Sequence, residues 1–339
     1  MKRLTQHMLF WPAIALVLLL VASTLFNPSF LTLTWRDGHL YGSVIDILNR
    51  AAPLMVVSLG MTLVIAVRGL DISVGAVVAI SAAVVALLIG GSFNATGDVQ
   101  SAHPLWVAIT AALAVSAACG LWNGLLVVKA GMQPIVATLI LMVAGRGIAQ
   151  LLTGGQIITV YYPPFFVLGN GFLLGLPVAL WIAASLWTAL HLLMSRTALG
   201  LFVRSIGGNP EAARVAGVRS AAITLCVYTF CSLAAGIAGL IVSSNVKSAD
   251  ANNAGQLLEL DAILAVTLGG TALTGGRFTL AGTVIGALII QTLTSMIYSL
   301  GVPPEVNLVV KAALVFAVML LQSGEFRQLV ARLARGRPA

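Results

Sequence analysis

The chain has 339 residues, of which 59% are apolar and only 8% are charged, and its formal net charge is +8. About 25% of the residues of an ordinary soluble domain are charged, so the composition excludes a soluble enzyme, a disulfide-stabilised secreted module and a disordered chain. The basic residues are scattered between apolar runs, which argues against a nucleic-acid-binding surface. The composition indicates a polytopic α-helical membrane protein that has the lipid bilayer as its main partner.

Ten apolar runs are candidates for membrane crossings. A helix that crosses the ~30 Å hydrocarbon core needs about 20 apolar residues. In chain order, the candidates are residues 8–26, 49–67, 72–90, 105–128, 134–152, 172–194, 220–243, 261–275, 280–300 and 306–322. The first follows Lys2 and Arg3 as a signal peptide would, but it continues to Phe26 without a cleavage site, so we expect a retained crossing. We therefore expect an all-α membrane protein with about ten transmembrane helices.

The distribution of positive charge predicts the orientation. Cytoplasmic loops of membrane proteins carry an excess of Lys and Arg. If the N-terminus is cytoplasmic, most of the 18 Lys and Arg residues lie inside, and only Arg36 and Lys247 lie in outer loops. Both termini are then cytoplasmic. The expected parts are an N-terminal tip with the first crossing (1–26), a first helical half (27–194), a cytoplasmic loop (195–219), a second helical half (220–322) and a basic cytoplasmic tail (323–339).

The sequence contains no motif for catalysis or nucleotide binding. No lysine follows a glycine, so the usual phosphate-binding loop is absent, and no HExxH motif, Cys/His cluster or nucleophile elbow occurs. The three cysteines lie in apolar runs and are interpreted as small buried hydrophobic residues. We expect no catalytic residue, no metal site and no cofactor in this chain. No acidic residue is central in a crossing, since Asp71, Glu259 and Asp261 lie near ends, which argues against an ion-driven carrier.

The largest inner loop, Ser195–Arg219, contains the signals of a short helix. Asn209 is a good N-cap, and Pro210 fits the first helical position. Glu211 complements the positive helix start, and Gly217 fits the position after the end. An isolated helix of about two turns is marginal in water, so it needs a docking surface. Two interpretations stay open: a helix lying on the bilayer, or a lever inserted into a separate cytoplasmic protein.

The motif Asn209–Gly217 resembles the Glu-Ala-Ala…Gly loop of ABC-importer permeases. Further stretches, among them Gly69–Gly75 and Leu258–Val266, resemble the ribose/galactose-type monosaccharide permeases. The stretches Ile45–Pro53, Leu121–Gly124, Gln133–Gln150 and Ala249–Gly255 resemble the galactofuranose-transporting members of that family. The resemblance covers nearly the whole chain and implies the permease subunit of an ATP-driven monosaccharide importer in the bacterial inner membrane.

The resemblance implies three protein partners. These are an ATP-binding subunit, which holds ATP and Mg²⁺, a periplasmic sugar-binding protein, and a second, non-identical permease. The residues expected to contact the ATPase subunit are Gly208, Asn209, Pro210, Glu211, Ala212, Ala213, Arg214, Ala216 and Gly217. An ion-gradient-driven sugar carrier is the main alternative, and a passive channel or a lipid-modifying membrane enzyme is a second.

Two glycine-rich junctions follow the second and the eighth crossing. Their placement is compatible with inverted repeats of crossings 2–5 and 7–10, a common transporter design. We expect Arg68 to pair with Asp71, and Asp71 to cap the third crossing. The residues with expected structural roles are Arg68, Asp71, Gly75, Gly269, Gly270, Gly275 and Gly276.

Uncharged polar side chains within or near crossings are candidates to line a sugar pathway. A sugar offers hydroxyl groups and apolar ring faces, which amides and hydroxyls suit. The same side chains also join helices to one another, so each candidate has a structural alternative. The candidates are Asn49, Asn123, Gln133, Thr138, Gln150, Gln156, Asn252, Asn253 and Gln291, together with the charged residue Arg146. Arg146 is expected to face the bundle interior, because Arg in lipid costs at least ~2.5 kcal/mol at the centre of a bilayer.

Overall fold

The structure is a computed structural model that describes residues 9–36, 38–90, 92–93, 99–100 and 103–301, together with residues 306, 308–310, 312–313, 316–317 and 320. The expected N-terminal tip up to residue 8 and the tail at 323–339 lie outside the described residues, as does much of the expected tenth crossing at 306–322.

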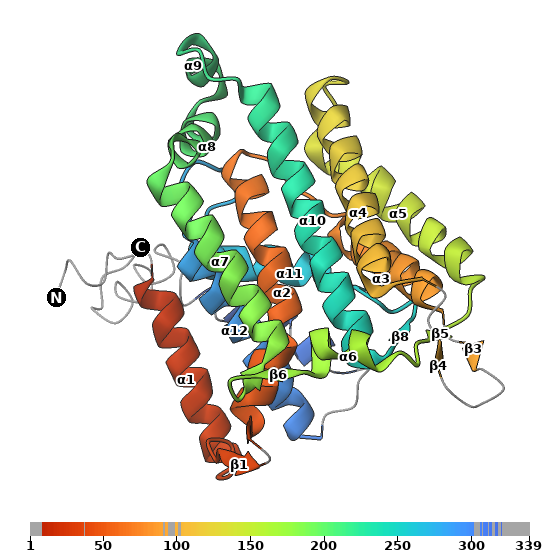
Figure 1. The fold of residues 1–339 in the computed structure, drawn as a ribbon. Helices are drawn as coiled ribbons and strands as arrows, with labels where there is room; N and C mark the ends of the chain where they lie inside the picture. The colour runs from red at the N-terminus through yellow and green to blue at the C-terminus, as the bar shows by residue number, and fades with distance from the viewer. Residues whose placement is uncertain are drawn as a thin grey trace, which may run out of the picture.

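The described chain is almost entirely helical, as expected from the sequence (Figure 1). Its helices are α1 (Phe10–Phe26), α2 (Ser43–Ala66), α3 (Val74–Ile89), α4 (Leu105–Val128), α5 (Pro134–Thr153), α6 (Pro163–Asn170), α7 (Val178–Arg196), α8 (Ala198–Gly208), α9 (Pro210–Val215), α10 (Ser220–Val246), α11 (Leu258–Leu268) and α12 (Leu280–Ser299). Short antiparallel pairs join β1 (Thr34–Arg36) to β2 (His39–Tyr41), β3 (Ser92–Phe93) to β4 (Val99–Gln100), β5 (Ile158–Thr159) to β8 (Ser248–Ala249), and β6 (Phe172–Leu173) to β7 (Leu176–Pro177).

Within the described ranges, six helices are long and apolar enough to cross a membrane: α2, α4, α5, α7, α10 and α12. Helices α1, α3 and α8 are apolar but shorter. The expected crossings at 105–128, 134–152 and 280–300 coincide with helices to within one residue at each end.

The expected crossing at 261–275 is wrong in its extent. Helix α11 has 11 residues, which rise about 16 Å at 1.5 Å per residue, too little to cross ~30 Å of hydrocarbon. The helix ends before Gly269 and Gly270, and Gly270 adopts φ +89°, a conformation that ends a helix. The non-helical segment that follows extends to Thr279.

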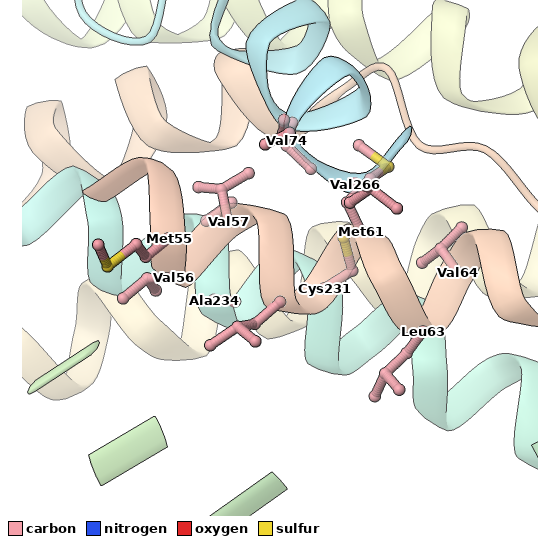
Figure 2. Packing of buried hydrophobic residues seen from close by; sticks show 14 of the residues in the cluster. Met55, Val56, Val57, Met61, Leu63, Val64, Val74, Cys231, Ala234 and Val266 are labelled. Atoms are coloured by element: carbon pink, nitrogen blue, oxygen red, sulfur yellow. The ribbon is translucent and has the colours of Figure 1, made fainter. Parts of the chain in front are cut away.

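Helix α2 is the centre of the bundle. Its residues from Ala51 to Ala66 are all buried, and it contacts α7, α10, α11 and α12. Figure 2 shows α2 side chains, among them Val57 and Met61, packed beside Cys231 and Ala234 of α10 and Val266 of α11. Between helices in a bilayer, van der Waals packing takes the place of the hydrophobic effect, so the close packing of α2 gives the surrounding helices a common support.

The expected inner and outer segments separate to opposite ends of the molecule. Helices α8 and α9 lie at the top of Figure 1, and the β-strands lie in its lower half. At the top, hereafter the α8–α9 end, the backbone of Gly276 donates to the carbonyl of Ala66 at 2.9 Å. At the other end, hereafter the strand end, β5 pairs with β8 and Asn49 of α2 donates to Gly169 of α6 at 3.2 Å. Segments expected on the same side of a membrane therefore meet one another.

Candidate functional site

The helix expected at 209–217 is present as α9. The side-chain oxygen of Asn209 accepts hydrogen bonds from the backbone N–H groups of Glu211 and Ala212, both at 3.1 Å. Pro210 occupies the first helical position. At the other end, Gly217 adopts φ +80° and its N–H donates to the carbonyl of Arg214 at 3.0 Å. Both caps agree with the capping signals in the sequence.

A second helix, α8, was missed in the sequence interpretation, which expected a single helix in this loop. Thr197 caps its start by accepting from the N–H of Leu199 at 3.3 Å. Three glycines in or at the end of the run lower its helix propensity, but Val203 and Ile206 are spaced to bury one face. The loop is therefore a helix–Asn209–helix unit.

The α8–α9 unit combines buried and exposed surfaces. Ala213 is buried, whereas Val215 is 82% exposed and Leu201 is 67% exposed. Glu211 and Arg214 form an exposed ion pair at 3.0 Å. The unit thus presents apolar side chains beside charged ones, a mixture that suits contact with another protein.

Arg68 connects this unit to the end of α2. Its guanidinium donates to the carbonyls of Gly207 and Gly208 at 2.7 and 2.6 Å. These are terminal carbonyls of α8, which lack partners within the helix. The expected pairing of Arg68 with Asp71 is wrong, because the Arg68 side chain instead caps α8, where the terminal carbonyls need donors.

Gly207 packs directly against the end of α2 and against Gly276. A Cβ on Gly207 would collide with the Ala66 carbonyl oxygen and with the Gly276 backbone. Gly275 and Gly276 both adopt φ +84°, which glycine tolerates without strain. We call the contact of Ala66, Arg68, Gly207, Gly208 and Gly276 the three-way junction. It joins α2, α8 and the turn before α12.

Asp71 belongs to a buried polar cluster between α2 and α3. Its Oδ1 accepts from the backbone N–H of Ser73 at 3.0 Å and from its hydroxyl at 2.6 Å. Asn123 of α4 donates to the Ser73 hydroxyl at 2.9 Å, and the Thr138 hydroxyl of α5 accepts from the N–H of Ile72 at 3.3 Å. The expected cap of α3 by Asp71 is wrong, because Ser73 is the N-cap and Asp71 bonds to it from outside the helix. The cluster holds the α2–α3 connection against α4 and α5.

Arg146 and Gln150 of α5 meet the turn that follows β8. Arg146 Nη1 donates to the carbonyls of Ala251 and Ala254 at 3.1 and 2.6 Å. Gln150 Nε2 donates to Asn252 Oδ1 at 2.7 Å. Gln150 and Asn252, two pathway candidates from distant parts of the chain, are therefore in direct contact.

Asp250 fixes this turn from within. Its Oδ2 accepts from Asn253 Nδ2 at 2.6 Å, and its Oδ1 accepts from the backbone N–H groups of Asn252 and Asn253 at 2.9 and 3.2 Å. The hydrogen bond from the Asn253 side chain, aided by those from the backbone, holds the pKa of Asp250 below its usual value. The carboxylate is therefore ionised at neutral pH and stabilises the turn, so Asn253 has a structural partner there.

A cavity of about 380 Å³ lies beside these residues, between α3, α5 and α11. It is lined by Ala76, Met142, Val143, Arg146, Gly147, Gln150 and Glu259. Its volume falls within the range of small-molecule sites, about 300–1,000 Å³. We call it the α5 cavity.

Glu259 is a charged residue of this cavity that the sequence analysis does not count among the pathway candidates. The interpretation placed it near the end of a crossing, whereas the structure leaves it only 5% exposed. Asp71 is completely buried as well, so position near a helix end does not keep either acid in water. Gly75, expected to be structural, packs on the Glu259 carboxylate, and a Cβ at this position would collide with it. The signal available was an acid immediately before an apolar run in Leu258–Val266.

The remaining pathway candidates do not reach the α5 cavity. Asn49 joins α2 to α6, and Gln291 is half-buried on α12. Gln133 and Gln156 are exposed beyond opposite ends of α5. The structure thus brings Arg146 and Gln150 together with the turn that holds Asn252 and Asn253. It places Asn123 and Thr138 in the Asp71 cluster, and the other candidates are dispersed.

Comparison with known proteins identifies the class. The family described as "branched-chain amino acid transport system / permease component" matches residues 43–319. The galactofuranose transporter permease protein of Escherichia coli K12 is 47% identical over 94% of this chain and 92% of its own length. The ribose import permease protein of Bacillus subtilis is 36% identical over 91% of each chain.

A probable ABC transporter permease protein of Sinorhizobium fredii is 31% identical over 77% of this chain and 75% of its own length. No solved structure gives a significant match. The resemblance to monosaccharide permeases seen in the motifs is confirmed, and the comparisons favour an ABC permease over an ion-driven carrier. The chain therefore belongs to the family of permease components of branched-chain amino acid transport systems, a family of membrane permeases.

Proposed function

We propose that the chain is the membrane-spanning subunit of an ATP-driven importer that moves a monosaccharide, galactofuranose first among them, into the bacterial cytoplasm. The single observation that carries this proposal is the 47% identity, over nearly the whole of both chains, to a galactofuranose transporter permease. The family description names branched-chain amino acids instead, so an aliphatic amino acid is the alternative substrate class. The apolar composition and the six long apolar helices support a multi-pass protein of the inner membrane.

We propose ten crossings with both termini in the cytoplasm, with crossings 2–5 and 7–10 arranged as inverted repeats. In this proposal α11 crosses only together with the non-helical segment that follows it, up to Thr279. The distribution of Lys and Arg supports this orientation. The meeting of residues 66–68, 207–208 and 276 at one end supports it as well, because all three segments are cytoplasmic in that topology. Broken helices beside the pathway are common in repeat-built transporters, and α11 with the glycines after it fits that pattern.

The α8–α9 unit is proposed to dock into a partner ATPase subunit, which binds ATP and Mg²⁺. Exposed Val215 and the Glu211–Arg214 pair supply a mixed apolar and charged contact surface. The three-way junction gives this contact a direct route to α2, because Arg68 joins the last carbonyls of α8 to the end of that helix. A movement of the unit is thereby transmitted to the centre of the bundle.

A second, non-identical permease is proposed to cover the exposed face of α5. Val143 is 69% exposed and Leu151 is 83% exposed on this helix, and the α5 cavity lies beside them. Arg146 and Gln150 on the same helix are poorly suited to lipid, since Arg costs at least ~2.5 kcal/mol at the bilayer centre. A protein partner on this face separates them from lipid.

A periplasmic sugar-binding protein is proposed to dock at the strand end. The segment 42–50 and the turn at 247–259 lie there, and both carry charged side chains in the described structure. Asp46 and Arg50 lie in the first turns of α2 and form an ion pair at 3.0 Å. In the proposed orientation this end faces the periplasm, which is where sugar is delivered.

The test is uptake by the reconstituted importer. Proteoliposomes containing this chain, its ATPase, the second permease and the binding protein are expected to accumulate galactofuranose only when ATP is supplied. Uptake driven by a cation gradient without ATPase would establish the carrier instead, and flux independent of ATP would establish a channel. Preferential uptake of L-leucine would assign the chain to the amino acid class.

The coupling role has a separate test in the same system. Glu211→Lys reverses a charge on the exposed face of α9, and Gly217→Pro removes the φ +80° residue that ends this helix. Both variants are expected to insert into the membrane but to lose uptake relative to ATP hydrolysis. Normal uptake in both would discard the coupling role.

The orientation of α9 is tested by labelling. The variant Val215→Cys is expected to react with an impermeant thiol reagent in inside-out vesicles but not in intact spheroplasts.

A further inference from the structure

The α5 cavity contains a buried acceptor that lacks a partner. We propose that this cavity is a monosaccharide-binding subsite of the permease itself, in which Glu259 accepts hydrogen bonds from sugar hydroxyl groups and Gln150 and Arg146 supply the opposite wall. This inference rests on the proposed function and adds the place where the permease holds its substrate during transfer.

Glu259 provides the first argument. Its side chain is more than nine-tenths buried, it lines the cavity, and its Oε2 has no hydrogen-bond partner in the described part of the chain. An unpaired buried polar atom costs about 1–3 kcal/mol, and most buried polar groups of proteins are paired. Oε2 now lies against Gly75, so a sugar hydroxyl group would supply the missing donor once the carboxylate turns toward the cavity.

Arg146 and Gln150 provide the second argument, because the turn at residues 250–254 holds both in place. Arg146 Nη1 is committed to the carbonyls of Ala251 and Ala254, and Gln150 Nε2 is committed to Asn252. Arg146 and Glu259 both line the cavity. Among the described residues, these two do not form an ion pair within 4.0 Å. Their opposite charges compensate at a distance, which favours a neutral ligand rich in hydroxyl groups.

The remaining walls suit the other surface of a sugar. Ala76, Met142, Val143 and Gly147 present apolar groups to the cavity, and the C–H faces of a sugar ring are apolar. Ligand sites are lined mainly by apolar groups with a few polar groups that fix orientation. The backbone supports this arrangement, since Gly75 lets the Glu259 carboxylate approach α3 closely.

The direct test measures binding to the cavity in the assembled importer. Val143→Cys is introduced in a background in which Cys119 and Cys226 are replaced by serine, and its labelling by N-ethylmaleimide is followed. The probes are galactofuranose, D-ribose and L-leucine, added to the complex held without ATP. A sugar is expected to slow the labelling. Glu259→Gln is expected to raise the sugar concentration needed for half-protection about 10- to 100-fold, as the loss of a charged hydrogen bond does.

Two further variants keep the test independent of misfolding. Glu259→Asp retains a carboxylate and is expected to raise that concentration less than Glu259→Gln does. Asp261→Asn changes an acid on the same helix that does not line the cavity, and it is expected to leave protection unchanged. The amount of assembled complex and its ATPase activity are measured for every variant.

The outcomes separate this inference from the proposed function. Unchanged protection in Glu259→Gln would overturn the subsite, as would equal protection by L-leucine. Lack of protection by any sugar in a complex that still accumulates sugar with ATP would overturn the subsite and leave the proposed function intact. Absence of sugar uptake by the unmodified importer would overturn the proposed function itself.

Discussion

The α8–α9 end and the α5 cavity use polar side chains in different ways. At the α8–α9 end, Arg68 and Asn209 bond to backbone groups at helix termini. In the α5 cavity, Arg146 and Gln150 are held by the turn at 250–254, while Glu259 Oε2 stays unpaired. Side chains that bond to the terminal backbone groups of helices hold those helices in one arrangement. A buried polar atom without a protein partner can instead bond to a ligand.

The difference also concerns glycine. At the α8–α9 end, Gly207 lets two backbone segments touch, so that a rigid contact passes from α8 to α2. Beside the α5 cavity, Gly75 lets a carboxylate side chain pack against a helix. In the proposed importer, the α8–α9 end transmits a movement and the α5 cavity receives a substrate, and variants that separate these roles test the comparison.

The largest effect is expected from Gly207→Ala. The new Cβ collides with the Ala66 carbonyl oxygen and with Gly276, so the backbone of the three-way junction must shift. ATP-driven uptake is expected to fall at least tenfold, while ATP hydrolysis continues. Gly208→Ala is the matched control, because a Cβ on this neighbouring residue meets no atom within 4 Å. Equal uptake in the two variants would show that the junction does not transmit movement.

A smaller effect, on stability, is expected from Asn123→Ala. Asn123 is completely buried and donates to the Ser73 hydroxyl. Its removal is expected to cost about 1–3 kcal/mol, the price of leaving buried polar groups unpaired, and to lower the thermal unfolding temperature of the complex. The ratio of galactofuranose to D-ribose uptake is expected to stay unchanged. A changed ratio would place Asn123 on the sugar pathway rather than in the cluster that holds α2 and α3.

The sequence predicted local features better than it predicted contacts between distant segments. The helix runs and the caps of α9 follow from hydropathy and from Asn209, Pro210 and Gly217, all of which act within a few residues. The α5 cavity depends on the meeting of α3, α5 and α11, which no local pattern contains. Glu259 was therefore missed as a cavity residue, although Arg146 and Gln150 were identified by their residue type.

The same distinction explains the errors at the α8–α9 end. Arg68 and Asp71 are three residues apart, so a local pair was the natural expectation. The structure sends Arg68 to α8 because two terminal carbonyls there need donors, a demand visible only once the helices are packed. Helix α8 was missed because its glycines lower local propensity, while its buried face against the bundle stabilises it.

Asn209→Ala sharpens the comparison further at the α8–α9 end. The substitution removes an N-cap that accepts two backbone hydrogen bonds, which typically costs about 1 kcal/mol. Helix α9 has only 6 residues, so its first turn is expected to fray. Uptake is expected to fall about two- to fivefold at unchanged ATP hydrolysis, and Asn209→Asp, which keeps a capping oxygen, is expected to restore it. A drop in Asn209→Asp equal to that in Asn209→Ala would indicate that the amide contacts the ATPase directly.

The smallest effect is expected at the strand end from Arg50→Ala. Arg50 pairs with Asp46 at 3.0 Å, but the two side chains are 67% and 59% exposed. Exposed ion pairs of this kind contribute about 0–1 kcal/mol, because water and salt screen the attraction and two long side chains lose freedom. The unfolding temperature is therefore expected to change by no more than the error of a thermal melt in detergent. If the binding protein docks on this segment, the variant weakens its stimulation of ATP hydrolysis at low salt and has less effect at high salt, since screening already removes the charge attraction. A loss of stimulation that is the same at both salt concentrations would show that Arg50 acts through shape rather than charge.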